Sequence, residues 1–207
     1  MNYRSNTRTL SRSRPYLPVA VLAAVLFAHC LPVMLTAQKT ARPAEWAKPL
    51  TKPGLPNLHQ VTPQFYRGAQ PSAQGMKQLH KLGIKTVINL RALHSDRDEI
   101  GSLPLRYEHI HFEPFLVEHD EVIRFLRIAT DKSAQPIFLH CQHGADRTGM
   151  LTALYRIVVQ GWSKERAITE MKKGGYGFHA IWQNLVQYIR RVNVAQLKAD
   201  VVRPAGK

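Results

Sequence analysis

One stretch of the sequence, IFLHCQHGADRTGM at residues 137–150, constrains the fold more than any other. An apolar run ends at Cys141, and a polar loop with a glycine at position 144 separates it from a second, longer apolar segment. This pattern predicts a buried strand, a tight loop and the start of a buried helix. Backbone N–H groups of such a loop and the dipole of the helix attract an anion. The sequence therefore predicts an anion site at residues 142–147, where Gly144 permits the turn.

Strands and helices alternate along the chain around this loop. The expected strands are residues 65–68, 85–90, 105–112 and 136–140, and the expected helices are 72–83, 120–130, 148–161, 163–175 and 178–192. We expect Ser72 and Asp120 to cap the first two helices. Because strands alternate with helices, the fold class is α/β, with helices covering the sheet.

The N-terminus has the form of a secretory leader. Residues 1–14 contain four arginines and no acid, and residues 17–37 form an almost uncharged apolar run. We expect residues 1–37 to be a signal peptide or, because Leu35 stands where cleavage prefers a small residue, an uncleaved signal anchor. We therefore expect export to the periplasm, with the domain either soluble or tethered to the inner membrane.

The rest of the chain is long enough for one domain with its own core. Residues 38–60 are rich in proline and lysine without periodicity, which predicts a linker. We expect the folded domain to span residues 61–195 and residues 196–207 to be a C-terminal tail.

The chain is strongly basic, with 29 Lys and Arg against 14 Asp and Glu and a formal charge of +15. Because residues 1–37 hold four arginines and no acid, the expected mature domain keeps a charge of +11. Such a charge favours an anionic partner, such as a phosphorylated protein, lipid or small molecule. No basic run has interleaved aromatic residues, so we do not expect a nucleic-acid partner.

Cys141 is the only cysteine beyond the expected leader, because Cys30 lies within the apolar run. A disulfide inside the mature domain is therefore excluded, although exported domains often contain one. Cys141 is either a buried core residue or a reactive one. A closed zinc site needs four ligands and the domain offers one sulfur, so we expect no metal. His109 and His111 have the ordinary pattern of a half-buried strand.

The loop gives Cys141 a specific chemistry. A free cysteine has a pKa near 8.5, and a helix N-terminus beside a cation lowers it to roughly 3.5 to 7.5. We therefore expect Cys141 to be a thiolate that attacks a bound phosphate in line and forms a phosphocysteine, which water hydrolyses. Arg147 offers a planar fork that matches two phosphate oxygens. Thr148 can donate its hydroxyl to the sulfur in the second step, and His140 orients the loop.

The combination of His140, Cys141, Gly144, Arg147 and Thr148 resembles the signature of cysteine-dependent protein phosphatases, the tyrosine and dual-specificity class. The low-molecular-weight branch has this loop near its N-terminus, so a loop that follows several strands and helices points to the dual-specificity branch. Three further segments, FYRGAQP, KTVINLR and YRIVVQGWSKERAITEMKKGGYGF, are similar to small exported bacterial members, the periplasmic tyrosine phosphatases.

The resemblance implies a single-domain cysteine-phosphatase fold, in which helices flank a central mixed sheet, without a metal or an organic cofactor. The phosphate-binding residues that it implies are Gln142, His143, Gly144, Ala145, Asp146 and Arg147. The implied activity is hydrolysis of phosphate monoesters, with protein phosphotyrosine as the first substrate and phosphoserine or phosphothreonine as further ones.

The proton donor for the leaving oxygen is the open point of this assignment. The resemblance implies an aspartate on a loop before the cysteine, but Phe115 stands there and cannot donate a proton. Glu113, Glu118 and Asp120 are candidate acids in the same region, although Asp120 also fits a helix cap.

Asp146 is another candidate acid, because it directly precedes Arg147. Phosphoinositide phosphatases of the myotubularin type carry an aspartate at this place, where it is a proposed acid. The alternative for Asp146 is a structural partner of a basic side chain. The Asp-Arg pair and His143 also favour a runner-up substrate, namely a phosphoinositide, an inositol phosphate or another lipid-linked phosphate.

Two other classes of function fit parts of the pattern. The absence of an aspartate from its usual loop fits a phosphate-binding module without turnover, and rhodanese-like sulfur transfer also uses a cysteine loop in a basic environment. Outside the loop, we expect Arg67 and Arg91 to be solvated charges at strand ends. The segment GGYGFH at 174–179 either lines the mouth of the site, through Tyr176, Phe178 or His179, or is a turn between helices.

Overall fold

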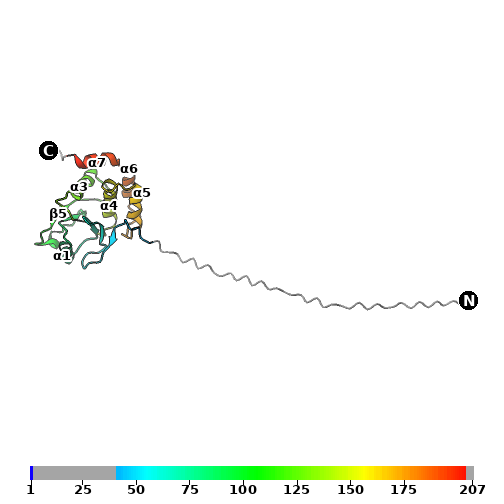
Figure 1. Cartoon of the computed structure of the whole chain (residues 1–207), viewed down its shortest axis with the longest axis horizontal. Helices are drawn as coiled ribbons and strands as arrows, with labels where there is room; N and C mark the ends of the chain where they lie inside the picture. The colour runs from blue at the N-terminus through cyan, green and yellow to red at the C-terminus, as the bar shows by residue number, and fades with distance from the viewer. Residues whose placement is uncertain (2–40, 204–207) are drawn as a thin grey trace. The chain divides into compact units, whose positions relative to one another are not determined.

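The structure, a computed structural model, describes residue 1 and residues 41–203 (Figure 1). Apart from residue 1, the expected leader lies outside the described residues, and so do residues 204–207 of the expected tail. Within residues 41–203, no helix has the length and apolar character that crossing a membrane requires.

A six-stranded sheet forms the centre of the domain (Figure 1). Its strands are β1 (Lys48–Pro49), β2 (His59–Thr62), β3 (Phe65–Gly68), β4 (Thr86–Asn89), β5 (Arg106–His109) and β6 (Ile137–His140). Their order across the sheet is β1, β2, β3, β6, β4, β5. The first three pair antiparallel, whereas β3, β6, β4 and β5 run parallel, so the expected mixed sheet is confirmed.

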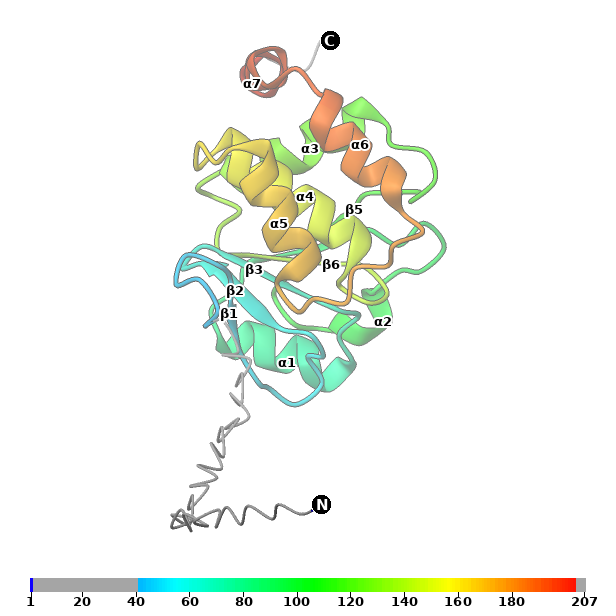
Figure 2. The same ribbon diagram turned by 90° about the vertical axis from the view of Figure 1, so that its right-hand side faces the viewer.

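Helices cover both faces of this sheet, as Figure 2 shows. One face carries α1 (Ala73–Lys81) and the short α2 (Arg97–Ile100). The other carries α3 (His119–Thr130), α4 (Asp146–Val158), α5 (Lys164–Lys173), α6 (Gln183–Arg191) and α7 (Val194–Val202). The expected α/β class with helical cover is therefore confirmed.

Alternation along the strands builds a separate core on each face of the sheet. In β6, Ile137 and Leu139 belong to the apolar cluster of α3 to α7, while Phe138 belongs to the cluster of α1. The next element, α4, is buried on nearly all sides, as its apolar sequence predicts. Because β6 and α4 are both buried, the loop that joins them is fixed at both ends.

The expected linker at 38–60 is wrong for its described part, because residues 41–60 pack on the domain. Ala47, Leu55 and Leu58 are at most 4% exposed, and Arg42 donates hydrogen bonds to the Ala47 carbonyl and the Tyr176 hydroxyl. The segment is rich in proline, and the spacing of its apolar residues follows neither the helix nor the strand period. Periodicity in the sequence therefore does not show that these residues are buried.

The expected boundary between domain and tail at residues 195 and 196 is also wrong. Helix α7 runs across it from Val194 to Val202 and buries Leu197 completely. The side chain of Asn193 caps this helix by accepting a hydrogen bond from Gln196 N, which is the start signal that the sequence reading missed.

Of the two expected helix caps, one is confirmed and one is wrong. Ser72 caps α1, because its side chain accepts a hydrogen bond from Gly75 N. In α3 the N-cap is Glu118 rather than Asp120. Asp120 lies within the first turn, where a negative charge still interacts favourably with the helix dipole.

We predict that the buried histidine at the start of β2 makes stability depend on pH. His59 is 7% exposed, and its burial, opposed by a hydrogen bond from its Nδ1–H to the Asn57 carbonyl, lowers its pKa from 6.5 to about 4. Between these values the unfolded chain binds a proton that the folded domain does not. Acidification from pH 6.5 to 4 should therefore lower the free energy of unfolding, by roughly 1 to 3 kcal/mol.

Urea unfolding at several pH values measures this dependence. His59→Leu should flatten it, whereas His80→Leu, at an exposed histidine of α1, should leave it unchanged. Equal slopes for the wild type and His59→Leu would contradict the assignment.

Candidate active site

The loop between β6 and α4 has the expected form of a strand, a tight turn and a helix start. Cys141 follows the last residue of β6 and is 3% exposed, and α4 begins at Asp146. The N-cap of α4 is Ala145, which offers no side chain to the free N–H groups of the first turn. These N–H groups therefore remain free to bind an anion.

Two glycines let this loop lie directly against the end of β3. Gly144 has a φ of +66°, and a Cβ built on it would lie 2.3 Å from the carbonyl carbon of Gly68. A Cβ on Gly68 would in turn lie 2.9 Å from the Phe138 ring. The loop N-terminal to α4 can take this path only with glycine at position 144.

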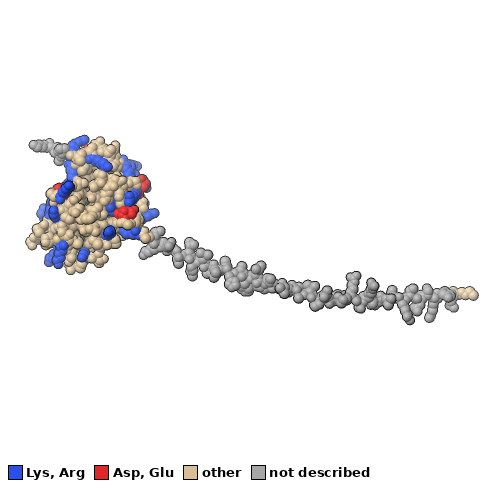
Figure 3. Space-filling view, viewed as in Figure 1, with Lys and Arg blue, Asp and Glu red and all other residues tan. Residues whose placement is uncertain are grey.

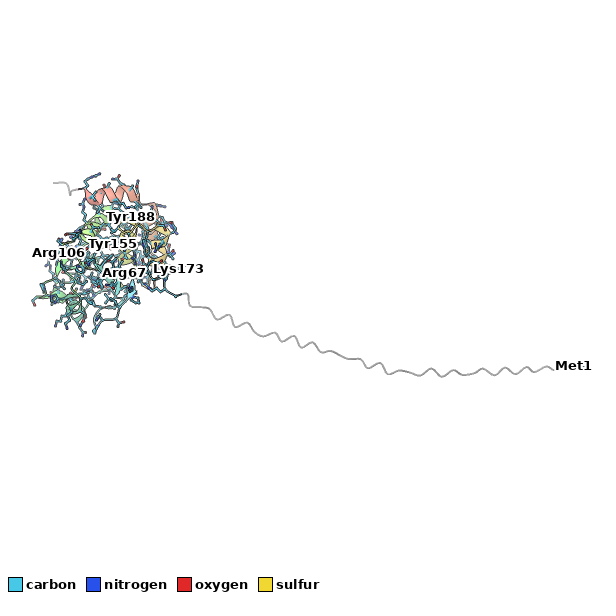
Figure 4. All side chains as sticks on the ribbon, viewed as in Figure 1. Met1, Arg67, Arg106, Tyr155, Lys173 and Tyr188 are labelled. Atoms are coloured by element: carbon cyan, nitrogen blue, oxygen red, sulfur yellow. The ribbon has the colours of Figure 1, made fainter. Side chains whose placement is uncertain are left out.

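Arg67 of β3, labelled in Figure 4, contacts the carbonyl side of the loop. It is 1% exposed, and its Nη2 donates a hydrogen bond of 2.6 Å to the Gly144 carbonyl. Its guanidinium carbon lies 3.9 Å from the centre of the Tyr176 ring. Burial lowers the pKa of Arg67, although Tyr176 and Glu170 oppose this effect. The expectation that Arg67 is a solvated charge is therefore wrong.

Glu170 of α5 completes the charge cluster below the loop. It is 2% exposed and accepts hydrogen bonds from Ala47 N at 2.7 Å, from the Tyr176 hydroxyl at 2.9 Å and from Arg156 at 2.9 Å through both Nε and Nη2. Burial and the negative charge of Glu170 raise the pKa of Tyr176 to about 12, so this hydroxyl remains a donor. The cluster links the N-terminal segment, α4 and α5 to the residue that supports the loop.

His140 is supported from the other face of the sheet by Asp96, which the sequence reading missed. Both are fully buried, and the Nε2–H of His140 donates a hydrogen bond of 2.7 Å to Asp96 Oδ2. Burial acts to raise the pKa of Asp96, but the hydrogen bond from His140 and its charge lower it below the usual value. Asp96 also accepts a hydrogen bond from Gln70 at 2.8 Å. His140 therefore lies in a fixed orientation immediately before Cys141.

Arg147 and Thr148 both lie in the first turn of α4. Arg147 is partly buried and donates hydrogen bonds to the carbonyls of Leu90 at 3.1 Å and Phe112 at 3.3 Å. The hydroxyl of Thr148 is buried and has no hydrogen-bond partner in the described part of the chain. The expected contact between this hydroxyl and the sulfur of Cys141 is therefore not formed in this conformation.

A cavity of about 390 Å³ opens above the loop. Its lining consists of Pro114, Gln142, His143, Asp146, Arg147, His179, Ile181 and Trp182. The segment 174–179 thus reaches the mouth of the site through His179, whereas Tyr176 is 3% exposed and lies in the buried cluster.

The candidate acids before the loop do not line this cavity. Asp120 lines a different cavity, together with Arg106 and Arg124, and Glu113 and Glu118 line neither of the two. In the same region, burial and the charges of Glu118 and Glu113 raise the pKa of Glu121 to about 7. Glu121 is likewise absent from the lining of the cavity above the loop.

Asp146 lines the cavity, but both of its carboxylate oxygens are occupied. Oδ1 accepts a hydrogen bond of 2.8 Å from His179 N, and Oδ2 accepts one of 2.8 Å from His179 Nδ1. This arrangement matches the alternative for Asp146, a partner of a basic side chain.

Among the described residues, His94, Asp96 and Glu99 are one group with the side chains of a metal site. His94 Nε2 lies 3.5 Å from Asp96 Oδ1 and 3.3 Å from Glu99 Oε1, which are distances of ion pairs. Asp96 is already engaged by His140 and Gln70. The absence of a metal and of an organic cofactor from the reaction stays a prediction.

Taken together, the loop offers free helix N–H groups and an arginine at one cavity, and Cys141 is buried at the start of the same loop. Such a site can bind a phosphate and place it against the sulfur. Lys and Arg side chains also spread over the visible face of the domain, with fewer Asp and Glu between them (Figure 3). This charge attracts anionic substrates.

Comparison with known proteins decides the family. The family model described as a DSP-PTPase phosphatase fused to NAD+ kinase matches residues 56–187, more than half of the chain. The chain belongs to this phosphatase family. The resemblance to cysteine-dependent phosphatases of the dual-specificity class is thereby confirmed.

Individual phosphatases of this class agree in sequence and in structure. The dual specificity protein phosphatase TpbA of Pseudomonas aeruginosa is 37% identical over 181 residues, which cover 86% of this chain and 82% of TpbA. Its crystal structure has a TM-score of 0.71 and 34% identity, and covers 78% of this chain and 99% of that one. A Cys-to-Ser variant of TpbA in complex with pTyr matches equally well. An inositol diphosphatase of Arabidopsis thaliana is 27% identical, covering 57% of this chain and 61% of its own.

Substitution of Gly144 in this phosphatase tests the close approach of its loop to β3. Gly144→Ala adds a Cβ that collides with the Gly68 backbone in addition to the strain of a positive φ. Gly161→Ala is the matched control, because Gly161 has a φ of +72° but no atom within 4 Å of the added Cβ. We expect Gly144→Ala to lower phosphatase activity more than tenfold and Gly161→Ala to cost only about 1 to 2 kcal/mol of stability. Equal activities of the two purified variants would contradict the assignment.

Proposed function

We propose that this phosphatase hydrolyses phosphotyrosine in proteins through a phosphocysteine formed on Cys141. The observation that carries the proposal is the position of Cys141, which is buried between a strand and a helix N-terminus, at the start of the loop that lines the cavity with Arg147. The pTyr complex of the related TpbA supports phosphotyrosine as the substrate.

In the first step, the loop N–H groups and Arg147 bind the phosphate and offset the charge that develops on it. The loop residues in this role are Gln142, His143, Gly144, Ala145 and Asp146. The thiolate of Cys141 attacks phosphorus, and the bond to the tyrosine oxygen breaks while this oxygen takes up a proton. His140, held by Asp96, keeps the start of the loop in place.

In the second step, water attacks the phosphocysteine and releases inorganic phosphate. The sulfur leaves as a thiolate, which a nearby hydroxyl stabilises. Thr148 is our candidate for this donor, because its hydroxyl is buried, adjacent to the loop and without another partner in the described structure.

A second substrate class is an inositol phosphate or a phosphoinositide. Its support is the related inositol diphosphatase together with the basic surface of the domain. Loss of turnover is a further alternative, because Phe115 occupies the place of the expected acid.

Cys141→Ser should lower turnover of phosphotyrosine peptides more than about 1,000-fold, because the serine hydroxyl is not ionised at neutral pH. Iodoacetamide should alkylate Cys141 in the wild type, and vanadate should protect it. A panel of phosphopeptides, phosphoinositides and inositol phosphates then ranks the substrates by kcat/KM. A burst of product without later turnover would instead indicate a phosphate-binding module that has lost turnover. Thiosulfate turnover without phosphatase activity would indicate sulfur transfer.

We also propose that the chain is exported to the periplasm by residues 1–37, and that the domain is soluble there or held at the inner membrane. The support is the arginine-rich start and the apolar run that follows it.

A fusion of residues 1–60 to mature β-lactamase, which lacks a leader of its own, should give ampicillin resistance in a Gram-negative host, because this enzyme protects the cell only after export. Changing Arg4, Arg8, Arg12 and Arg14 to glutamate should abolish the resistance. Resistance that is independent of these charges, or absent from the unaltered fusion, would contradict export by this leader.

A further inference from the structure

The active-site cavity contains few groups that can carry a proton to the leaving oxygen. Among its lining residues, only His143, Asp146 and His179 can donate one, apart from the permanently charged Arg147. Glu113, Glu118, Asp120 and Glu121 do not line it. The proton donor of this conformation therefore belongs to the loop or to the segment that faces it.

We propose that His179 is the proton donor and that Asp146 is the residue that positions it. This assignment rests on the phosphocysteine reaction proposed above. It gives the role of the expected aspartate to a histidine that lies 38 positions beyond Cys141 in the sequence.

Two hydrogen bonds to one carboxylate fix the histidine. Asp146 accepts from the backbone N–H of His179 and from its ring Nδ1–H, both at 2.8 Å. The side chain of Asp146 is 10% exposed, whereas that of His179 is 51% exposed. Because Nδ1 is directed at Asp146, the nitrogen that can exchange a proton with substrate is Nε2. An acceptor behind one ring nitrogen is the usual way to orient a catalytic histidine.

The chain is built to bring His179 back over the start of α4. Gly175 and Gly177 have φ values of +76° and +83°, which turn the chain after α5. Tyr176 between them is anchored in the buried cluster through Glu170. The side chain of Asn57 donates hydrogen bonds of 2.9 Å both to the Tyr176 carbonyl and to the His143 carbonyl. The segment that carries His179 is thus tied to the phosphate-binding loop itself.

His143 is the competing donor, because its ring lies 5.5 Å from the ring of His179. In the described structure its ring nitrogens have no hydrogen-bond partner, and no carboxylate is paired with them. His143 therefore lacks the group that would fix its orientation. The geometry favours His179.

The proton balance of the reaction follows directly. As the sulfur–phosphorus bond forms and the bond to the tyrosine oxygen breaks, Nε2–H of the protonated His179 gives its proton to that oxygen, and free tyrosine leaves. Nε2 is then a base and takes a proton from the attacking water as the sulfur–phosphorus bond breaks. Cys141 returns as a thiolate and His179 returns to its protonated form, ready for the next turnover.

The experiment compares aryl phosphates whose leaving groups differ in their need for a proton. A phenolate such as that of phosphotyrosine needs one, whereas 2,4-dinitrophenolate departs without it. We use kcat/KM because it reports the steps up to the phosphocysteine and is independent of its hydrolysis. His179→Gln should lower kcat/KM about 100-fold or more for phenyl phosphate and less than about threefold for 2,4-dinitrophenyl phosphate.

Two further variants separate His179 from its neighbours. Asp146→Asn should also lower kcat/KM selectively for phenyl phosphate, but by a smaller factor. The double variant of Asp146→Asn and His179→Gln should be no slower than His179→Gln alone, because the two residues act as one unit. His143→Gln should lower both rates by the same factor. His80→Gln, at an exposed histidine on α1, is the matched control and should change neither rate.

Several outcomes would overturn the assignment of His179. If His179→Gln lowered kcat/KM equally for both substrates, His179 would have a structural role. If kcat/KM did not change, His179 would have no role in the reaction. A larger selective loss in Asp146→Asn, in His143→Gln or in Glu113→Gln, Glu118→Gln, Asp120→Asn or Glu121→Gln would identify that residue as the donor. Turnover of 2,4-dinitrophenyl phosphate that Cys141→Ser does not reduce would instead show that the proposed phosphocysteine reaction is wrong.

Discussion

The hydrogen bond from Arg67 to the Gly144 carbonyl is the contact on which the rest of the site depends. A fully buried guanidinium is costly unless its charge is compensated. Here the loop carbonyl, the Tyr176 ring and the nearby Glu170 carboxylate compensate the charge, whereas Nε of Arg67 has no hydrogen-bond partner among the described residues. The same cation binds the carbonyl side of the loop, so the N–H groups on the opposite side are available to bind the anion. The electrostatics of the site are therefore set inside the core of the domain.

The loop is supported from both faces of the sheet. Arg67 shares a face of β3 with Phe65, toward α4, because side chains two positions apart point the same way. His140 shares the opposite face of β6 with Phe138, toward α1, where it meets Asp96. Two buried polar pairs on opposite sides thus hold one short loop. Because these pairs fix the conformation of the loop, its backbone N–H groups can stay unpaired without a rearrangement of the loop.

The sequence predicted the features that depend on local pattern. Apolar runs marked β4, β6 and α4, and the spacing from His140 to Thr148 marked the loop and its chemistry. It did not predict the partners of the loop, because these come from distant positions. Arg67 is 77 residues from Gly144, Asp96 is 44 residues from His140, and Asn57 is 86 residues from His143. No periodicity connects such pairs, so only the folded chain brings them together.

The signature loop is not a self-sufficient unit. A chain that stopped soon after α4 would keep every residue from His140 to Thr148, yet it would lack Glu170, Tyr176 and His179. A chain that began at β3 would lack Asn57 and the backbone N–H of Ala47 that Glu170 binds. Shortened gene products or fusions that carry the motif alone would therefore be poor guides to activity, since the smallest competent unit extends well beyond the motif on both sides.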